Sequence, residues 1–237
     1  MDYDKLPDIP EVFFNSETNQ PFSNCLVCAC NLKEESQPYA IERAIRHYPE
    51  MELKSVVFEY ALCAKCIAQM ENELSADTKM SIMQYFSQNL DFASRPQWKP
   101  AADVDEDENA DSAEEVLFDV NEWIDTCSVK GVSRSELYEY TLCARCIGGK
   151  IIPEVVPYMI SGLAQDDLVE LFSNKSLGFL DDFTDKHFSG PPELKELFKG
   201  RPILVWLSSV IFSEISARIG KLCLVFIFAL GLKPSTK

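Results

Sequence analysis

Cysteines arranged as Cys-x-x-Cys pairs are the residues of this sequence best suited to chemistry. The stretch EYALCAKCI, from Glu59 to Ile67, holds one pair, and the similar stretch EYTLCARCI, from Glu139 to Ile147, holds another. A further pair, Cys25 and Cys28, precedes the first stretch. Two thiols at this spacing can bind one ion from a single tight turn, and zinc needs four such ligands in a tetrahedron. Buried free cysteines are common, but paired and repeated Cys-x-x-Cys favours a metal site over packing.

The first metal site is predicted to use the two pairs that lie before residue 70. Its four ligands would be Cys25, Cys28, Cys63 and Cys66. The second of these pairs comes where a strand-like segment gives way to a helical one. Free N–H groups and the helix dipole at such a position favour thiolate over thiol, and the thiolate is the form that binds metal. We therefore expect one Zn²⁺ to stabilise this region as a closed site of four cysteines.

The order of these features resembles the treble-clef group of zinc fingers over roughly the first ninety residues. That resemblance implies a knuckle, meaning a tight turn with two ligands, that carries Cys25 and Cys28. It also implies that the first turn of a helix carries Cys63 and Cys66. The sequence departs from the pattern at Ala29, where knuckles often have a glycine that can adopt positive φ.

A second, incomplete copy of the cysteine pattern follows later in the chain. Cys127 corresponds to Cys25, but Lys130 stands where the partner of Cys127 is expected. The thiols that remain for a second metal site are Cys127, Cys143 and Cys146. The fourth ligand would be His187, Asp125 or Cys30. A second zinc ion and a module that has lost its metal are both compatible with this pattern.

The elements that must position these thiols predict an α+β fold of two related small modules. In the first, residues 51–63 have the β-branched and aromatic content of a strand, and Ser75 is a suitable N-cap for a helix that follows the Cys pair. Residues 40–48 predict a helix, because Glu42 and Arg46 are spaced i,i+4 opposite an apolar stripe. In the second module, a strand over 136–142, a Cys pair and a helix over 164–172 repeat the unit.

Composition divides the chain into four parts. Residues 94–115 contain two prolines and a dense run of carboxylates, which is typical of a flexible acidic linker. The linker separates a first module (1–93) from a second, degenerate one (116–200), and an apolar helical segment (201–237) follows.

The apolar stretch from Ile203 to Leu232 is long enough to span a bilayer. Glu214, Arg218 and Lys221 interrupt it, and charges near the middle of a bilayer are costly. The pattern favours a buried or partner-facing element over a membrane anchor. A tail-anchored membrane protein with a zinc-binding head stays an alternative.

Charge and motif content narrow the function further. A net charge of −16 argues against a nucleic-acid partner, because binding phosphates requires an excess of Lys and Arg. Nine cysteines without a secretory signal are typical of the reducing cytoplasm. The chain has only two histidines and no H-E-x-x-H or phosphate-binding loop. We expect a non-catalytic zinc protein that binds another protein; a cytoplasmic thiol–disulfide redox protein is the rival.

Overall fold

The computed structural model describes residues 6–34, 37–90, 119–153 and 157–188, which form the α+β fold that the sequence predicts. Within these ranges the strands make one five-stranded antiparallel sheet, in the order β2-β1-β3-β4, with β5 also paired to β3. The strands are β1 (Pro38–Tyr48), β2 (Leu53–Cys63), β3 (Glu139–Ile147), β4 (Lys150–Ile151) and β5 (Tyr158–Ser161).

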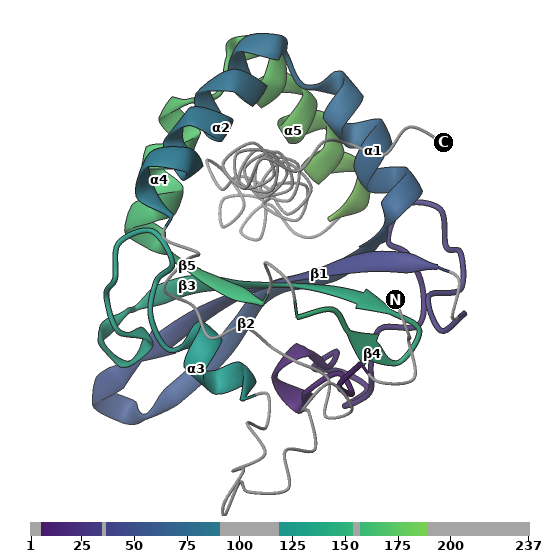
Figure 1. Cartoon of the computed structure of the whole chain (residues 1–237), viewed down its shortest axis with the longest axis vertical. Helices are drawn as coiled ribbons and strands as arrows, with labels where there is room; N and C mark the ends of the chain where they lie inside the picture. The colour runs from purple at the N-terminus through teal and green to yellow at the C-terminus, as the bar shows by residue number, and fades with distance from the viewer. Residues whose placement is uncertain (1–5, 35–36, 91–118, 154–156, 189–237) are drawn as a thin grey trace, which may run out of the picture.

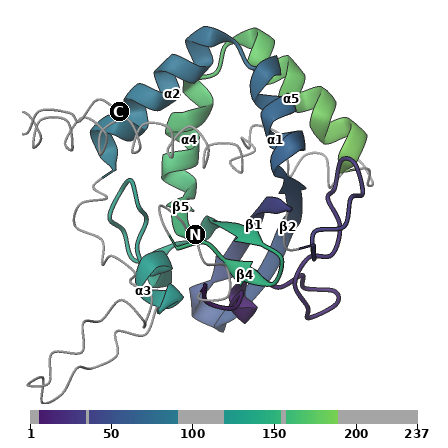
Figure 2. The same ribbon diagram turned by 45° about the vertical axis from the view of Figure 1, so that its right-hand side comes forward.

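The longer helices lie on one side of this sheet, as Figures 1 and 2 show. These are α1 (Ala64–Glu73), α2 (Ala76–Asn89), α4 (Gly162–Glu170) and α5 (Asn174–His187). The short α3 (Val120–Ile124) and the N-terminal segment lie on the other side. Three 3₁₀ turns complete the described elements: η2 (Glu11–Phe13), η3 (Pro49–Met51) and η5 (Arg134–Glu136).

The helix predicted over residues 40–48 is wrong, because this segment is the central strand β1. β1 pairs with β2 along one edge and with β3 along the other, so its backbone is bonded on both sides. Its side chains are buried on both faces, which explains why the apolar residues do not alternate. Glu42 and Arg46 do not pair with each other here. Glu42 accepts a hydrogen bond from the Tyr60 hydroxyl, and Arg46 Nε donates to Glu139 Oε1 over 2.8 Å.

The predicted strand and helices around the first nonapeptide are confirmed. β2 runs directly into α1, so that Cys63 ends the strand and also occupies the N-cap of the helix. Ser75 caps α2, and its Oγ accepts a hydrogen bond from Thr78 N over 3.1 Å. The chain therefore turns from sheet to helix at the pair Cys63 and Cys66.

The two units read from the sequence contribute to a single sheet and a single core. The pairing of β1 with β3 joins them, and one cluster of buried apolar side chains runs through both. The predicted linker (94–115) and the apolar stretch (203–232) lie outside the described residues. Among the helices that the structure describes, none has the length and apolar character needed to cross a membrane.

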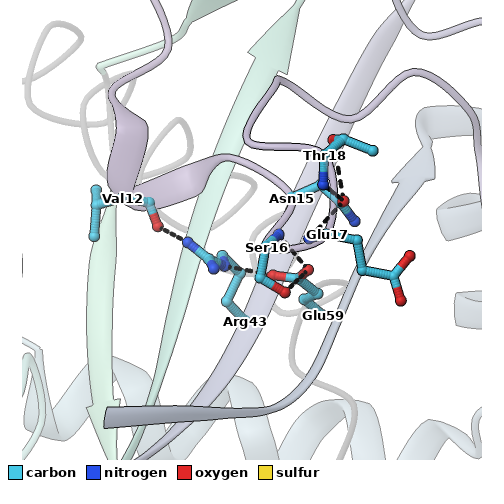
Figure 3. Close-up of polar contacts among 7 residues, drawn as sticks. All are labelled: Val12, Asn15, Ser16, Glu17, Thr18, Arg43 and Glu59. Atoms are coloured by element: carbon cyan, nitrogen blue, oxygen red, sulfur yellow. Dashed lines mark hydrogen bonds and ion pairs between the residues drawn. The ribbon is translucent and has the colours of Figure 1, made fainter. Parts of the chain in front are cut away.

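A buried ion pair holds the N-terminal segment against the sheet, as Figure 3 shows. Arg43 on β1 and Glu59 on β2 are cross-strand neighbours, and Arg43 Nε donates to Glu59 Oε2 over 2.8 Å. Arg43 also donates to the Val12 carbonyl, while the backbone N and the Oγ of Ser16 each donate to Glu59 Oε1 over 2.6 Å. Both charges are thus satisfied by the segment that leads into the first Cys pair.

Candidate metal centre

The first Cys pair lies on a tight turn, the first knuckle, which runs from Cys25 to Cys30. Ala29 N donates to Cys25 O over 2.9 Å, and Cys25 N donates to Cys30 O over 3.0 Å. Ala29 closes the turn with a φ of 56°, so an alanine adopts the left-handed conformation that a glycine adopts more easily. A further bond of 2.9 Å, from Leu26 N to Ala61 O, holds the knuckle against β2.

Thiols from the knuckle and from the end of β2 converge on one point. The Sγ atoms of Cys25, Cys28, Cys30 and Cys63 all lie within 4.8 Å of one another. Cys28 Sγ and Cys63 Sγ are 3.7 Å apart. Zinc–sulfur bonds of about 2.3 Å in a tetrahedron place two ligand sulfurs about 3.8 Å apart. The cluster is therefore able to bind a metal ion and is compatible with zinc.

Cys66 approaches the same point from the first turn of α1. Its thiol interacts with those of Cys63, Cys28 and Cys25, although Cys66 is not part of the tighter group of four. The four ligands predicted for the first site thus lie together. The sequence reasoning missed Cys30 as a member of this cluster, and the spacing Cys28-x-Cys30 was the signal that could have found it.

The electrostatic environment of the cluster differs strongly between its thiols. Burial raises the pKa of Cys25 and of Cys66, and it raises the pKa of Cys30 to about 12. The exposed Cys28 is the opposite case, because a hydrogen bond from the backbone N–H of Cys30 lowers its pKa to about 6. A divalent cation among these sulfurs would favour the thiolate form of all of them. The chemistry of the donor set therefore fits a soft or borderline metal ion.

The second nonapeptide is not placed like the first, and this corrects the predicted unit of strand, Cys pair and helix. Residues 139–147 form a single strand, β3, so Cys143 and Cys146 lie within it and not at a helix start. Residues three apart on a strand point to opposite faces. Cys143 pairs across the sheet with Glu42 and Tyr158, whereas Cys146 pairs with Tyr39. Their sulfurs cannot chelate one ion.

The structure does not bring the residues proposed for a second site together. Within the described ranges, Cys127, Cys143 and Cys146 do not belong to any group of three metal-binding side chains. Asp125 follows α3 and accepts a backbone bond from Arg134, and His187 ends α5. Cys30, the third candidate, belongs to the first cluster.

A groove of about 480 Å³ opens beside the cysteine cluster, between α1 and α5. Its lining is partly apolar and partly charged: Val27, Cys66, Gln69, Met70, Asn72, Glu73, Phe179, Asp182, Phe183, Lys186 and His187. The volume is in the range of pockets that hold small ligands or side chains of a partner.

Comparison with known proteins gives no guide beyond this geometry. No protein-family model, curated protein or solved structure matches the chain.

Proposed function

We propose that the chain is a non-catalytic zinc-binding protein whose cysteine cluster is a structural site. The observation that carries the proposal is the convergence of the thiols, with Cys28 and Cys63 at the 3.7 Å separation expected of zinc ligands. Zinc bound here would join the first knuckle, β2 and α1 through a single ion. Four thiolates also complete the coordination of zinc, which leaves no open position to activate water.

Metal analysis of the purified full chain tests this proposal. We expect about one zinc per chain, because one cluster is present among the described residues. Removal of the metal with a chelator should lower the thermal midpoint, since structural zinc contributes directly to the free energy of folding. Protein that is free of metal and melts at the same temperature with and without chelator would contradict the proposal.

We also propose that the zinc-bound protein binds another protein through the groove between α1 and α5. The groove adjoins Cys66, so its walls depend on the metal site, and it presents apolar side chains beside charged ones. Such mixed surfaces are typical of interfaces.

Panning a random peptide library against the zinc-loaded chain tests the groove. Enriched peptides should lose binding to Phe179→Glu, which places a charge in the groove. The control Ser81→Glu alters α2 at a site outside the groove lining and should bind normally. Equal binding to both variants would reject the groove as the site.

A thiol–disulfide redox protein is the second candidate, and Cys28 is the observation that favours it. This thiol is exposed, its pKa is lowered to about 6, and Cys63 Sγ lies 3.7 Å away. Low-pKa, accessible thiols with a resolving partner are the groups that exchange disulfides. Metal-free protein with a reversible disulfide, detected by alkylation and mass spectrometry, would favour this candidate over the zinc protein.

A cytoplasmic location is the proposal that suits either function. All eight cysteines in the described ranges are free thiols, and such thiols persist in reducing compartments. Fractionation of cells that express the full chain tests the location. Recovery in the membrane pellet after a high-salt wash would instead support residues 203–232 as a membrane anchor.

We further propose that the two halves of the chain are copies of one module, related by a local two-fold axis through the sheet. Tyr39 on β1 pairs with Cys63, the residue before α1, and Tyr140 on β3 pairs with Ser161, the residue before α4. β1 and β3 pair antiparallel with each other. If Tyr39 is matched to Tyr140, the same alignment three residues further on matches Glu42 to Cys143. These two residues face each other across β1 and β3, as residues on either side of a two-fold axis must.

The helix caps support the same axis. Ser75 caps α2 and Ser173 caps α5, and their Oγ atoms are 2.8 Å apart. Each cap also bonds to the opposite helix: Ser75 N donates to Ser176 Oγ over 3.0 Å, and Ser173 N donates to Thr78 Oγ1 over 2.9 Å. Two such reciprocal bonds are the arrangement that a two-fold relation between the helix pairs would produce.

A further inference from the structure

Five thiols surround the point where a tetrahedral zinc ion takes four. The Sγ atoms of Cys25, Cys28 and Cys63 lie within 4.8 Å of one another, and the Cys66 thiol interacts with all three. Cys30 joins them within the 4.8 Å group, and Cys66 joins them through its contacts with the same three thiols. The cluster therefore contains two overlapping four-thiol sets that differ only in whether Cys30 or Cys66 is the fourth member.

The two alternative ligands reach the site from different elements. Cys30 closes the first knuckle, where its carbonyl accepts the bond from Cys25 N. Cys66 lies in the first turn of α1, two residues past the start of the helix at Ala64. Both sulfurs already lie near the three shared thiols in this one conformation of the chain.

We propose that the ion is held by Cys25, Cys28 and Cys63 together with either Cys30 or Cys66, which exchange as the fourth ligand. This inference rests on the proposed zinc-binding function and concerns the regulation of that site. With zinc bound, Cys30 would give up its proton as it became the fourth ligand, and the displaced Cys66 thiolate would take one up. The spare thiol gives the ion a route by which one ligand can be replaced without an empty coordination position.

An exchangeable ligand makes the metal available to an external thiolate acceptor. In a site with four thiols and no spare, the acceptor itself must displace a ligand, whereas here a fifth thiol can already compete for the fourth position. The consequence is a site that binds zinc firmly at equilibrium and yet transfers it readily. Such behaviour suits a protein whose fold responds to the supply of zinc.

Metal content of four forms of the full chain tests the two ligand sets. The forms are wild type, Cys30→Ser, Cys66→Ser and the double variant that carries both changes. We expect about one zinc per chain in wild type and in each single variant, because each single variant keeps the three shared thiols and one of the two alternative fourth ligands. The double variant keeps three and should lose most of its zinc. Zinc lost from Cys66→Ser alone would overturn the proposal, since it would show that Cys30 cannot replace Cys66.

Release rates provide the second readout, with a chromophoric chelator as the acceptor. Cys30→Ser should release zinc on the order of tenfold more slowly than wild type, equivalent to about 1.4 kcal/mol in the barrier. Cys146→Ser is the matched control, because Cys146 is a buried thiol outside the cluster. Equal release rates in wild type and Cys30→Ser would reject the exchange.

Alkylation of the zinc-loaded wild type makes the test independent of folding in the variants. Exchange predicts that Cys30 and Cys66 are both labelled slowly and that the three shared ligands are protected. Labelling confined to Cys30 would show a fixed ligand set and overturn the proposal. Absence of zinc from wild type would instead reject the proposed function, so the two failures are distinguishable.

Discussion

The first knuckle and the turn from Cys127 to Val132, the second knuckle, share a backbone but differ in their side chains. Cys127 N donates to Val132 O over 2.8 Å, and Gly131 N donates to Cys127 O over 2.8 Å, as the equivalent groups do in the first knuckle. Gly131 has a φ of 67°, in the position of Ala29. Ser128 N bonds to Met159 O over 2.9 Å, which repeats the bond that holds the first knuckle to its strand.

Three of the four predicted zinc ligands are replaced by other residue types at the equivalent positions of the second half. Both knuckle cysteines accept a backbone bond from the residue before a helix: Cys63 N reaches Cys25 Sγ over 3.4 Å, and Ser161 N reaches Cys127 Sγ over 3.2 Å. With this match, the equivalents of Cys28, Cys63 and Cys66 are Lys130, Ser161 and Ala164. Of the four ligand positions, only the position of Cys25 still holds a cysteine, which is Cys127.

An ion pair lies where the metal ligands are missing. Lys130 Nζ is 2.5 Å from an Asp167 carboxylate oxygen, and Tyr85 donates to the same carboxylate over 2.7 Å. The pair links the second knuckle to α4, as a metal would link the first knuckle to α1. The comparison teaches that one backbone framework can be closed either by a thiolate cluster or by charged side chains.

Replacement of one ligand of the first knuckle's site should have the largest effect on stability. Cys63→Ser should lose the zinc and with it binding free energy on the order of 10 kcal/mol, which would unfold the N-terminal half. Cys143→Ser is the control from the similar nonapeptide, and it should retain the metal because Cys143 lies in β3, away from the cluster. Zinc content and circular dichroism measure both. Retention of zinc by Cys63→Ser would contradict the proposed ligand role.

Restoration of the missing ligands should make the two knuckles alike. The triple variant Lys130→Cys, Ser161→Cys and Ala164→Cys, together with Cys127, should bind a second zinc ion. Cobalt substitution would reveal it as a doubling of the thiolate charge-transfer absorption. A control with Ser128→Cys in place of Lys130→Cys adds the same number of thiols but leaves one ligand position unfilled. If the folded triple variant still binds one ion, the equivalence of the ligand positions is rejected.

Loss of the ion pair between Arg43 and Glu59 should have an intermediate effect on the free energy of unfolding. Its side chains are only 10% and 8% exposed. Arg43→Met should therefore lower the free energy of unfolding by roughly 3–5 kcal/mol, because it leaves a buried carboxylate without its partner. Arg46→Met removes a more exposed pair, with side chains 31% and 32% exposed, and should cost roughly 0–1 kcal/mol. Urea denaturation measures both, and equal losses would argue against a special role for the N-terminal anchor.

The two helix caps should give smaller effects than the buried ion pair, and they test the equivalence of the two halves directly. Ser75→Ala and Ser173→Ala should each lower stability by about 1–2 kcal/mol, because each removes an N-cap and a bond to the opposite helix. The double variant should lose less than the sum, since the two hydroxyls share one hydrogen bond. Strict additivity in a double-mutant cycle would show that the caps act independently.

Local chemistry allowed much of the first site to be predicted from the sequence. Ser75 identified a helix start because its hydroxyl satisfies a free N–H, and that interaction needs no distant residue. The Cys pairs identified their own cluster because four thiols have one common use as metal ligands. Cys30 was assigned to the second site as a candidate ligand, because the Cys-x-x-Cys pairs already supplied four thiols for the first, although Cys30 folds into the first cluster.

The predictions that failed concern segments whose conformation is decided by tertiary contacts, which a local sequence pattern does not contain. Ile41, Ala44 and Ile45 match a helical stripe, but strands on both sides of β1 bury its two faces and decide its conformation. The two nonapeptides look equivalent in sequence, yet one crosses from strand into helix and the other stays in the sheet. The bonds between Ser75 and Ser173 depend on how two distant helix pairs meet.

The hydroxyls of Ser75 and Ser173 at the helix caps connect the two halves of the chain. Each half supplies hydrogen-bond partners to a helix start in the other, so each half on its own would lose those partners. A chain cut between residues 94 and 115 should yield two fragments that are poorly folded apart. Mixed together, the fragments should reconstitute the native protein, with each one acting as the template for the other.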